Sequence, residues 1–266
     1  ADPYLLFGVG GGFRATVDAI SQGAIAFGGP VLVIHGDGHV YTVDTPFRDF
    51  AGNALNNVWR VEVPGALDIP EIWYKQPVYY KANRFSVVGH EHYVIWPGYS
   101  NFMDFELEFG VYIGKPAKDV KKADAMDHVF GYTIFNDFTA RDAQTAEMGG
   151  SLGPAKGKDF DTANPMGPCL VTADEFGDPY DKTMICRVNG EEWGRGSTST
   201  MHWSFGDLIE HISASETIRS GEFLGSGTVG NGCGLEHMRF LSPGDVVELE
   251  VEGIGVLRNK LVKPGA

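Results

Sequence analysis

Short runs of apolar and polar positions recur along this chain from about residue 77 to its end. The clearest are "PVYYK", "HYVIW", "DFELEFGVYIG", "VFGYTIFND", "CLVTA", "TMICRVNGEEWG" and "DVVELEVEGIGVLRN". They are rich in β-branched and aromatic residues and are bounded by Gly, Pro, Asp and Asn, which is typical of strands. Two segments, "AKDVKKADAM" and "SFGDLIEHISAS", have helical periodicity. The pattern predicts a mainly β fold with a few short helices, in the α+β class.

The first 70 residues follow a different pattern. Within them, "RATVDAISQGAIAFG" predicts a short helix, and "GPVLVIHGDGHVYTV" predicts a hairpin that turns at "GDG". The stretch "PGALDIP", residues 64–70, is typical of a boundary. We therefore predict a small N-terminal region, 1–70, and a larger domain, 71–266.

Two glutamates interrupt the apolar run "FMDFELEFGVYIGK", residues 102–115. Successive side chains of a strand alternate between faces, so Glu106 and Glu108 share one face with Asp104, and Phe105 and Leu107 lie on the other. A carboxylate that faces the protein interior is costly unless a cation or several donors compensate it. This face is therefore either exposed to solvent or part of a metal site, and the run alone leaves both open.

Later segments offer partners for these carboxylates. Asp137 ends the apolar run of "GYTIFNDFTARDAQ" and would be a third oxygen ligand. Oxygen donors without clustered Cys or His favour Mg²⁺, Mn²⁺ or Ca²⁺ over zinc. Lys158 in "GPAKGKDFD" and Thr228 in "LGSGTVGNG" lie in glycine-rich stretches that let backbone and side chains approach an anion. Taken singly, each has a simpler interpretation: a solvated strand face, a turn, a surface lysine or an ordinary loop.

Composition excludes several classes of protein. The formal net charge of −14 over 266 residues argues against a nucleic-acid or anionic-membrane surface. We find no apolar run of about 18 residues and no signal segment, so we expect no membrane span. Three widely spaced cysteines match neither a disulfide framework nor a zinc site. A reducing, cytoplasmic location is the simplest expectation.

From about residue 73 to the C-terminus, the chain resembles the fumarylacetoacetate hydrolase superfamily. The resemblance rests on five motifs in order, "DFELEFGVYIGK", "GYTIFNDFTARDAQ", "KGKDFDT…PMGPCLVTADE", "VNGEEWGRGSTSTM" and "GSGTVGNG", with "LSPGDVVELEVEGIGVLRN" closing the chain. It implies a mixed β-sandwich or roll, usually a homodimer. It also implies one divalent metal, commonly Mg²⁺, on Glu106, Glu108 and Asp137.

The resemblance further implies a small-molecule substrate, a 2-oxo or 1,3-dicarbonyl acid whose oxygens chelate the metal and which reacts through an enolate. Lys158, Arg141 and Thr228 match catalytic positions of the family. Gln144 matches a position that lines its substrate pocket. Lys81 and Arg84, in "PVYYKANRFSVVG", match the segment that supplies the far wall of that pocket.

One departure limits the predicted reaction. Hydrolytic members usually carry a His–Glu dyad that activates water, and this chain has no histidine between His39 and His90. The nearest substitutes are His90 and His92, although a solvent-exposed turn explains them as well. We predict cleavage of a C–C bond, by hydrolysis or β-keto acid decarboxylation. The alternatives are a non-hydrolytic isomerase, dehydratase or cyclising enzyme, or a non-catalytic binder of 2-oxo acids.

Overall fold

The structure, a computed structural model, describes residues 31–38, 42–44, 58–64, 74–150 and 153–265. The chain divides into two compact units, 1–78 and 79–266. This division lies eight residues beyond the predicted boundary at residue 70.

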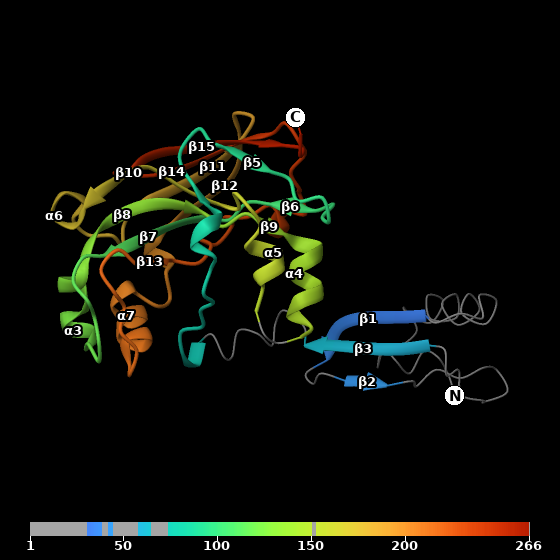
Figure 1. The fold of residues 1–266 in the computed structure, drawn as a ribbon, viewed down its shortest axis with the longest axis horizontal. Coiled ribbons are helices and arrows are strands. Elements are labelled where there is room, and N and C mark those ends of the chain that lie inside the picture. Colours follow the sequence, from blue (N-terminus) through green and yellow to red (C-terminus); the bar gives the residue numbers. More distant parts are fainter. Residues whose placement is uncertain (1–30, 39–41, 45–57, 65–73, 151–152, 266) are drawn as a thin grey trace. The chain divides into compact units, whose positions relative to one another are not determined.

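The described part of the first unit is a three-stranded sheet in the order β1-β3-β2 (Figure 1). Its strands are β1 (Val31–Gly38), β2 (Thr42–Asp44) and β3 (Val58–Pro64). β1 pairs with β3 in parallel, and β2 pairs with β3 antiparallel. The predicted β1–β2 hairpin is therefore wrong, because β3 lies between the two strands. The helix predicted in "RATVDAISQGAIAFG" falls outside the described residues.

Two five-stranded sheets form the second unit (Figure 1). The first has the order β13-β7-β8-β10-β4, made of β4 (Val87–Val88), β7 (Leu107–Ile113), β8 (Val129–Asn136), β10 (Asn164–Thr172) and β13 (Phe223–Gly225). The second has the order β12-β11-β14-β15-β5, made of β5 (Tyr93–Ile95), β11 (Thr183–Val188), β12 (Glu191–Ser197), β14 (Val246–Val251) and β15 (Gly255–Val262). This layered arrangement confirms the predicted fold class.

Short elements connect the sheets. A two-stranded ribbon pairs β6 (Met103–Asp104) with β9 (Thr139–Ala140). The helices are α3 (Lys122–Ala125), α4 (Arg141–Met148), α5 (Ala155–Lys158), α6 (Ala173–Phe176) and α7 (Phe205–Ser213). Single 3₁₀ turns are η2 (Arg84–Ser86), η3 (Met126–His128), η4 (Thr198–Thr200) and η5 (Leu235–His237). Among the described helices, none is long and apolar enough to cross a membrane.

The apolar core joins the two sheets. Phe109 of β7 and Tyr132 of β8 belong to one buried cluster with Met184 of β11 and Leu249 of β14. Phe109 also packs edge-on against Phe205 of α7, with ring centroids 5.1 Å apart. Burial of each such side chain contributes about 1.5–3 kcal/mol. The apolar face of β7, predicted from the alternation, therefore lies against this core.

Two of the predicted elements differ from the structure. The run "PVYYK" is not a strand, and none of its residues has regular secondary structure. The helix predicted from residue 117 begins only at Lys122, because Ala117 instead forms an isolated β-bridge with Ile218. Local periodicity cannot detect that distant partner.

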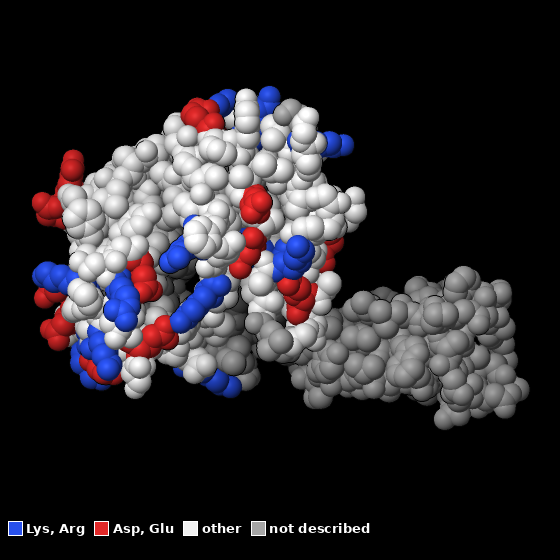
Figure 2. All heavy atoms as spheres, viewed as in Figure 1, with Lys and Arg blue, Asp and Glu red and all other residues white. Residues whose placement is uncertain are grey.

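Acidic and basic side chains are interspersed over the face of the second unit that Figure 2 shows. Some exposed charged side chains of this unit pair with each other, such as Arg195 with Glu192 and Arg239 with Glu191. This mixed face is unlike the continuous basic surface that binds nucleic acid.

Candidate active site

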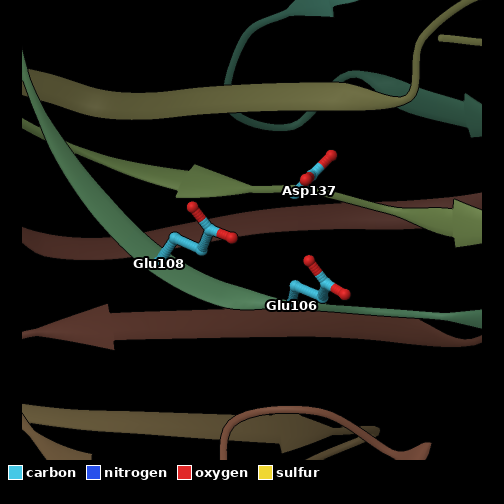
Figure 3. Close-up of side chains that lie close together, drawn as sticks. All are labelled: Glu106, Glu108 and Asp137. Carbon is cyan, nitrogen blue, oxygen red and sulfur yellow. The ribbon is translucent and has the colours of Figure 1, made fainter. Parts of the chain in front are cut away.

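The pairing of β7 with β8 brings three carboxylates together. In this antiparallel pair, Leu107 is opposite Asn136 and Glu108 is opposite Phe135. Glu106, directly before β7, and Asp137, directly after β8, therefore lie side by side. Figure 3 shows the side chains of Glu106, Glu108 and Asp137 pointing toward one another, and their nearest carboxylate oxygens lie within 4.8 Å. These residues are only 8%, 4% and 3% exposed, so the solvated-face interpretation is wrong.

Lys158, the last residue of α5, supplies a positive charge to this cluster. Its Nζ donates to Glu106 Oε2, Asp137 Oδ2 and the Thr139 hydroxyl, each at 2.8 Å. The side chain is buried, so the surface-lysine interpretation is wrong as well. The residue before it must be glycine for a structural reason: a Cβ at Gly157 would lie 2.7 Å from the Cβ of Gln144. α5 can pack this closely against α4 only with glycine there.

Arg141, the first residue of α4, connects the cluster to Asp104. Its Nη1 donates to Glu106 Oε1 at 2.7 Å and to Gln144 Oε1 at 3.0 Å. Its Nε and Nη2 both donate to Asp104 Oδ2, at 2.8 and 2.6 Å. Asp104 therefore lies behind Arg141 and outside the group of three carboxylates. The sequence pattern placed it on their face, but the structure gives it a different partner.

Two residues of the site, Tyr80 and Asn164, were not predicted as site residues from the sequence, and a third contact comes from Gly227, in the glycine-rich stretch whose backbone was expected to approach an anion. The Tyr80 hydroxyl donates to Asp137 Oδ2 at 2.6 Å, and Asn164 Nδ2 donates to Asp137 Oδ1 at 3.2 Å. The backbone N–H of Gly227 donates to Glu108 Oε2 at 3.0 Å. The signal for Tyr80 is its place next to Lys81, in the segment that the resemblance assigns to the wall of the substrate pocket. No local signal marks Asn164.

Burial and charge shift the pKa values of the acidic groups in different directions. Burial, together with the neighbouring Asp137 and Glu106 carboxylates, raises the pKa of Glu108 well above its usual value. Burial also acts to raise the pKa of Glu106, but Lys158 and Arg141 outweigh it and the net shift is downward. Burial acts to lower the pKa of Lys158, but the Glu106 and Asp137 carboxylates raise it. Lys158 is therefore a fixed cation at neutral pH.

The residues present fit a divalent cation. Four buried carboxylates, those of Asp104, Glu106, Glu108 and Asp137, face two buried cations, Lys158 and Arg141. With all four carboxyl groups ionised, as metal ligands would be, the difference is two negative charges, and buried charge of this kind is costly unless it is compensated. The three clustered donors are carboxylate oxygens, which Mg²⁺, Mn²⁺ and Ca²⁺ prefer. These three residues could hold one such ion.

The structure places the remaining predicted residues as follows. Thr228 is half-buried in the loop after β13, next to Gly227. Lys81 is exposed and forms an ion pair with Glu216. Arg84 is exposed, with its guanidinium 4.8 Å from the centre of the Phe85 ring. The substrate-binding roles of Lys81 and Arg84 stay predictions, and both of these contacts are to residues outside the carboxylate cluster.

The two candidate substitutes for the missing dyad histidine have other partners. His90 Nδ1 accepts the backbone N–H of Arg258 at 3.1 Å, and His92 Nδ1 lies 2.9 Å from the carbonyl oxygen of Tyr93. Both contacts lie at strands of the second sheet, β15 and β5. Neither histidine is hydrogen-bonded to a residue of the carboxylate cluster, so the structure does not support either as the base that activates water.

This chain matches a family profile and several known proteins. The family profile described as fumarylacetoacetate (FAA) hydrolase C-terminal matches residues 50–262. Human oxaloacetate tautomerase FAHD2A, a mitochondrial protein, is 40% identical over 189 residues, which are 71% of this chain and 60% of that protein. Oxaloacetate tautomerase YisK of Bacillus subtilis is 37% identical over 205 residues, 76% of this chain and 65% of that protein. This chain thus spans about 60% of the length of the human relative.

Solved structures share the fold. A 2-hydroxyhepta-2,4-diene-1,7-dioate isomerase from Mycobacterium marinum superposes with a TM-score of 0.64 at 34% identity, covering 72% of this chain and 71% of that one. A putative fumarylpyruvate hydrolase from Burkholderia cenocepacia has the same TM-score, 0.64, at 28% identity, covering 70% of this chain and 80% of that one. The names of these four proteins include tautomerases, an isomerase and a hydrolase.

Proposed function

Because this chain belongs to the fumarylacetoacetate hydrolase family, we propose that it is a divalent-metal-dependent enzyme acting on a 2-oxo or 1,3-dicarbonyl acid through an enolate. The observation that carries this proposal is the buried group of three carboxylates, two of which accept hydrogen bonds from Lys158. A non-catalytic binder would need the metal ligands but not a buried ammonium beside them. Mg²⁺ is the proposed ion, with Mn²⁺ or Ca²⁺ as substitutes.

The metal and the two cations would share the work of stabilising the enolate. A divalent ion held by Glu106, Glu108 and Asp137 would act as a Lewis acid on the oxygens of the substrate. Lys158 and Arg141 add fixed positive charge in a buried site, where water screens it little. Gln144 accepts a hydrogen bond from Arg141 and thereby orients the guanidinium. Thr228 is our candidate contact for a carboxylate or oxyanion of the substrate.

Among enolate reactions, we favour keto–enol tautomerisation of a short 2-oxo diacid. Tautomerisation needs the enolate and two proton transfers, whereas hydrolysis also needs an activated water. Both histidines nearest to the missing dyad position are hydrogen-bonded at the second sheet. The relatives named oxaloacetate tautomerases, at 37–40% identity, support the same choice. Decarboxylation or hydrolysis of a C–C bond is the second candidate, favoured by the putative fumarylpyruvate hydrolase among the structural neighbours.

Three assays on one preparation separate these reactions. Metal-loaded protein is mixed with oxaloacetate, and ultraviolet absorbance follows the approach to keto–enol equilibrium against a blank of metal alone. Pyruvate formation reports decarboxylation, and ¹⁸O from labelled water in the acid product of an acylpyruvate reports hydrolysis. Keto–enol equilibration faster than in the blank, without pyruvate formation and without ¹⁸O incorporation, supports tautomerisation. Pyruvate or ¹⁸O product would support the second candidate, and no rate above the blank in any assay would overturn the proposed function.

Location and assembly stay predictions. All three cysteines, Cys169, Cys186 and Cys233, are free thiols, which fits the reducing compartment that we propose. The human relatives are named as mitochondrial, so the cytoplasm is one of two such compartments to test. The homodimer is likewise a proposal from family membership.

A further inference from the structure

Residues 79–86, which we call the strap, cross the site with one side chain pointing inward. The Tyr79 ring packs edge-on against His211 of α7, with centroids 6.2 Å apart, and Lys81 pairs with Glu216. Between them, Tyr80 points the opposite way and donates its hydroxyl hydrogen to Asp137 Oδ2 at 2.6 Å. The two outward contacts flank Tyr80, so they keep it turned toward the carboxylate.

The other end of the strap reaches the same carboxylate through a second residue. The Ser86 hydroxyl is shared between the Asn83 carbonyl oxygen and Asn164 Oδ1. That contact turns the amide nitrogen of Asn164 toward the site, where it donates to Asp137 Oδ1 at 3.2 Å. Ser86 and Asn164 are 0% and 1% exposed, so water does not compete for these hydrogen bonds.

The strap thereby reaches both oxygens of Asp137, Oδ2 directly through Tyr80 and Oδ1 indirectly through Asn164. A carboxylate offers about four lone-pair positions. Among the described residues, three side chains donate hydrogen bonds to Asp137: Tyr80 and Lys158 to Oδ2, and Asn164 to Oδ1. Glu108 accepts one, from Gly227. Glu106 accepts two, from Arg141 and Lys158. Asp137 therefore has the most such donors of the three carboxylates, and two of its three donors depend on the strap.

We propose that Tyr80 and Ser86 are positioning residues for the divalent cation. Tyr80 orients Oδ2 of Asp137 directly, and Ser86 orients Oδ1 through Asn164. Held in this way, Asp137 keeps one orientation before the ion arrives, so binding loses less side-chain freedom. This inference rests on the proposed function, because it assumes that Asp137 is a metal ligand.

Mg²⁺ titration of the metal-stripped full chain by calorimetry tests it. Tyr80→Phe removes only the hydroxyl, and we expect Mg²⁺ to bind about 10- to 100-fold more weakly, which is the usual effect of removing a partner of a metal ligand. Tyr79→Phe is the matched control: it makes the same change one residue away, on an exposed ring, and should leave the Mg²⁺ affinity unchanged. Mn²⁺, counted by the loss of its free-ion electron paramagnetic resonance signal, gives a second readout independent of activity.

Ser86→Ala provides an independent variant if Tyr80→Phe fails to fold. It should also weaken Mg²⁺ binding. In the double variant, the two losses should not add, because both act on one carboxylate. Wild-type protein that binds neither ion would overturn the proposed function itself. Wild-type protein that binds Mg²⁺, with either single variant binding it equally well, would overturn this inference and leave the proposed function intact.

Discussion

At the scale of single residues, Lys158 differs from an ordinary lysine because three acceptors surround its ammonium. Two of these acceptors, on Glu106 and Asp137, are carboxylates that we propose as metal ligands. Lys158 therefore has two separable effects: it supplies positive charge to the site, and it competes with a cation for the same oxygens.

Replacing Lys158 by methionine separates these effects. We expect Lys158→Met to lower kcat by at least about 100-fold, as removal of a single charge-stabilising donor does elsewhere. The affinity for Mg²⁺ should not decrease, because the competing ammonium is gone. Steady-state kinetics and Mg²⁺ calorimetry measure the two quantities. Lys156→Met, two residues earlier on the exposed face of α5, is the control and should change neither. A Lys158→Met variant with wild-type kcat would contradict the catalytic role.

Asp104 and Arg141 form the buried ion pair behind the site. Asp104 is 0% exposed, and besides Arg141 it accepts the backbone N–H groups of Gly234 and Leu235 at 2.7 and 3.0 Å. Removing the Asp104 charge takes away its charge-assisted hydrogen bonds with Arg141, which keeps Glu106 as an ionic partner. We expect Asp104→Asn to lower the free energy of unfolding by about 1–3 kcal/mol, measured by urea denaturation.

An exposed pair provides the contrast. Glu192 and Arg195 interact at 2.8 Å on the surface of β12. Solvent screens them, so Glu192→Gln should cost less than about 1 kcal/mol in the same urea experiment. Equal losses for the two variants would show that burial of Asp104 adds nothing to its pair.

At the scale of elements, the segment from Asn231 to Arg239 connects β7 to the ion pair. Cys233 forms a β-bridge with Glu106, and the next residue, Gly234, touches Asp104. A Cβ on Gly234 would lie 2.1 Å from the Arg239 carbonyl oxygen and 2.7 Å from Asp104 Oδ1. Gly230 directly precedes this segment, and a Cβ added to it would have no heavy atom within 4 Å.

This difference predicts that an alanine at position 234 lowers the stability of the protein, whereas an alanine at position 230 leaves it almost unchanged. Gly234→Ala forces the backbone away from Asp104, and we expect a loss of about 1–3 kcal/mol in the free energy of unfolding. Gly230→Ala should stay within about 0.5 kcal/mol of wild type. Thermal and urea denaturation of both variants measure this, and a Gly234→Ala variant as stable as Gly230→Ala would show that the loop relaxes freely.

The N-terminus of α7 carries a pH-dependent contribution to stability. Ser204 and Asp207 form a capping box, and Lys122 pairs with Asp207 at 2.7 Å. Burial acts to raise the pKa of Asp207, but the donors from Lys122 and Ser204 outweigh it, so its pKa lies below the usual 3.8. The stabilisation is therefore complete above the unfolded-state pKa and disappears as the pH falls through the lower folded-state value.

We expect Asp207→Asn to cost about 1 kcal/mol at pH 7. The difference from wild type should shrink below the unfolded-state pKa of about 3.9. Urea midpoints of both proteins at pH 7, 5 and 3 measure it, and effects of other titrating groups cancel in the difference. A constant gap over this range would mean that the charge of Asp207 contributes nothing.

At the scale of the whole molecule, the second unit places acidic groups of the first sheet at one buried point, where their net charge opposes folding. Since a ligand that binds only the folded state raises its stability, metal-stripped protein should melt at a higher temperature with Mg²⁺. Oxalate, a planar mimic of an enolate of a 2-oxo acid, should add a further shift only when Mg²⁺ is present. At a free Mg²⁺ concentration 100 times its dissociation constant, the free energy of unfolding should increase by about 2.7 kcal/mol.

The control for this measurement is Glu108→Gln, which removes one proposed ligand and should abolish most of the shift. Oxalate alone should have little effect on either protein. No shift of the wild-type melting temperature with Mg²⁺ or Mn²⁺, with or without oxalate, would mean that the carboxylates are structural.

Much of the β architecture could be predicted from the sequence, because the alternation of side chains along a strand is a local property. It placed Glu106 and Glu108 on one face and Leu107 on the other, and the apolar face does enter the core. The ordered motifs also indicated the family, because they are a property of the sequence alone. Two of the failures share a cause, a partner far along the chain: β3 lies between the two strands of the predicted hairpin, and Ile218 bridges to the first residue of the predicted helix.

The sequence by itself thus determined the strand faces, the acidic ligand types and the family. Only the tertiary structure decided which groups meet. The β7–β8 register placed Asp137 beside Glu106, the close packing of α5 on α4 brought in Lys158, and the strap added Tyr80. It also moved Asp104 from the predicted carboxylate face to Arg141. Hydrogen bonds and ion pairs depend on distances between residues far apart in the chain, and local patterns do not contain those distances.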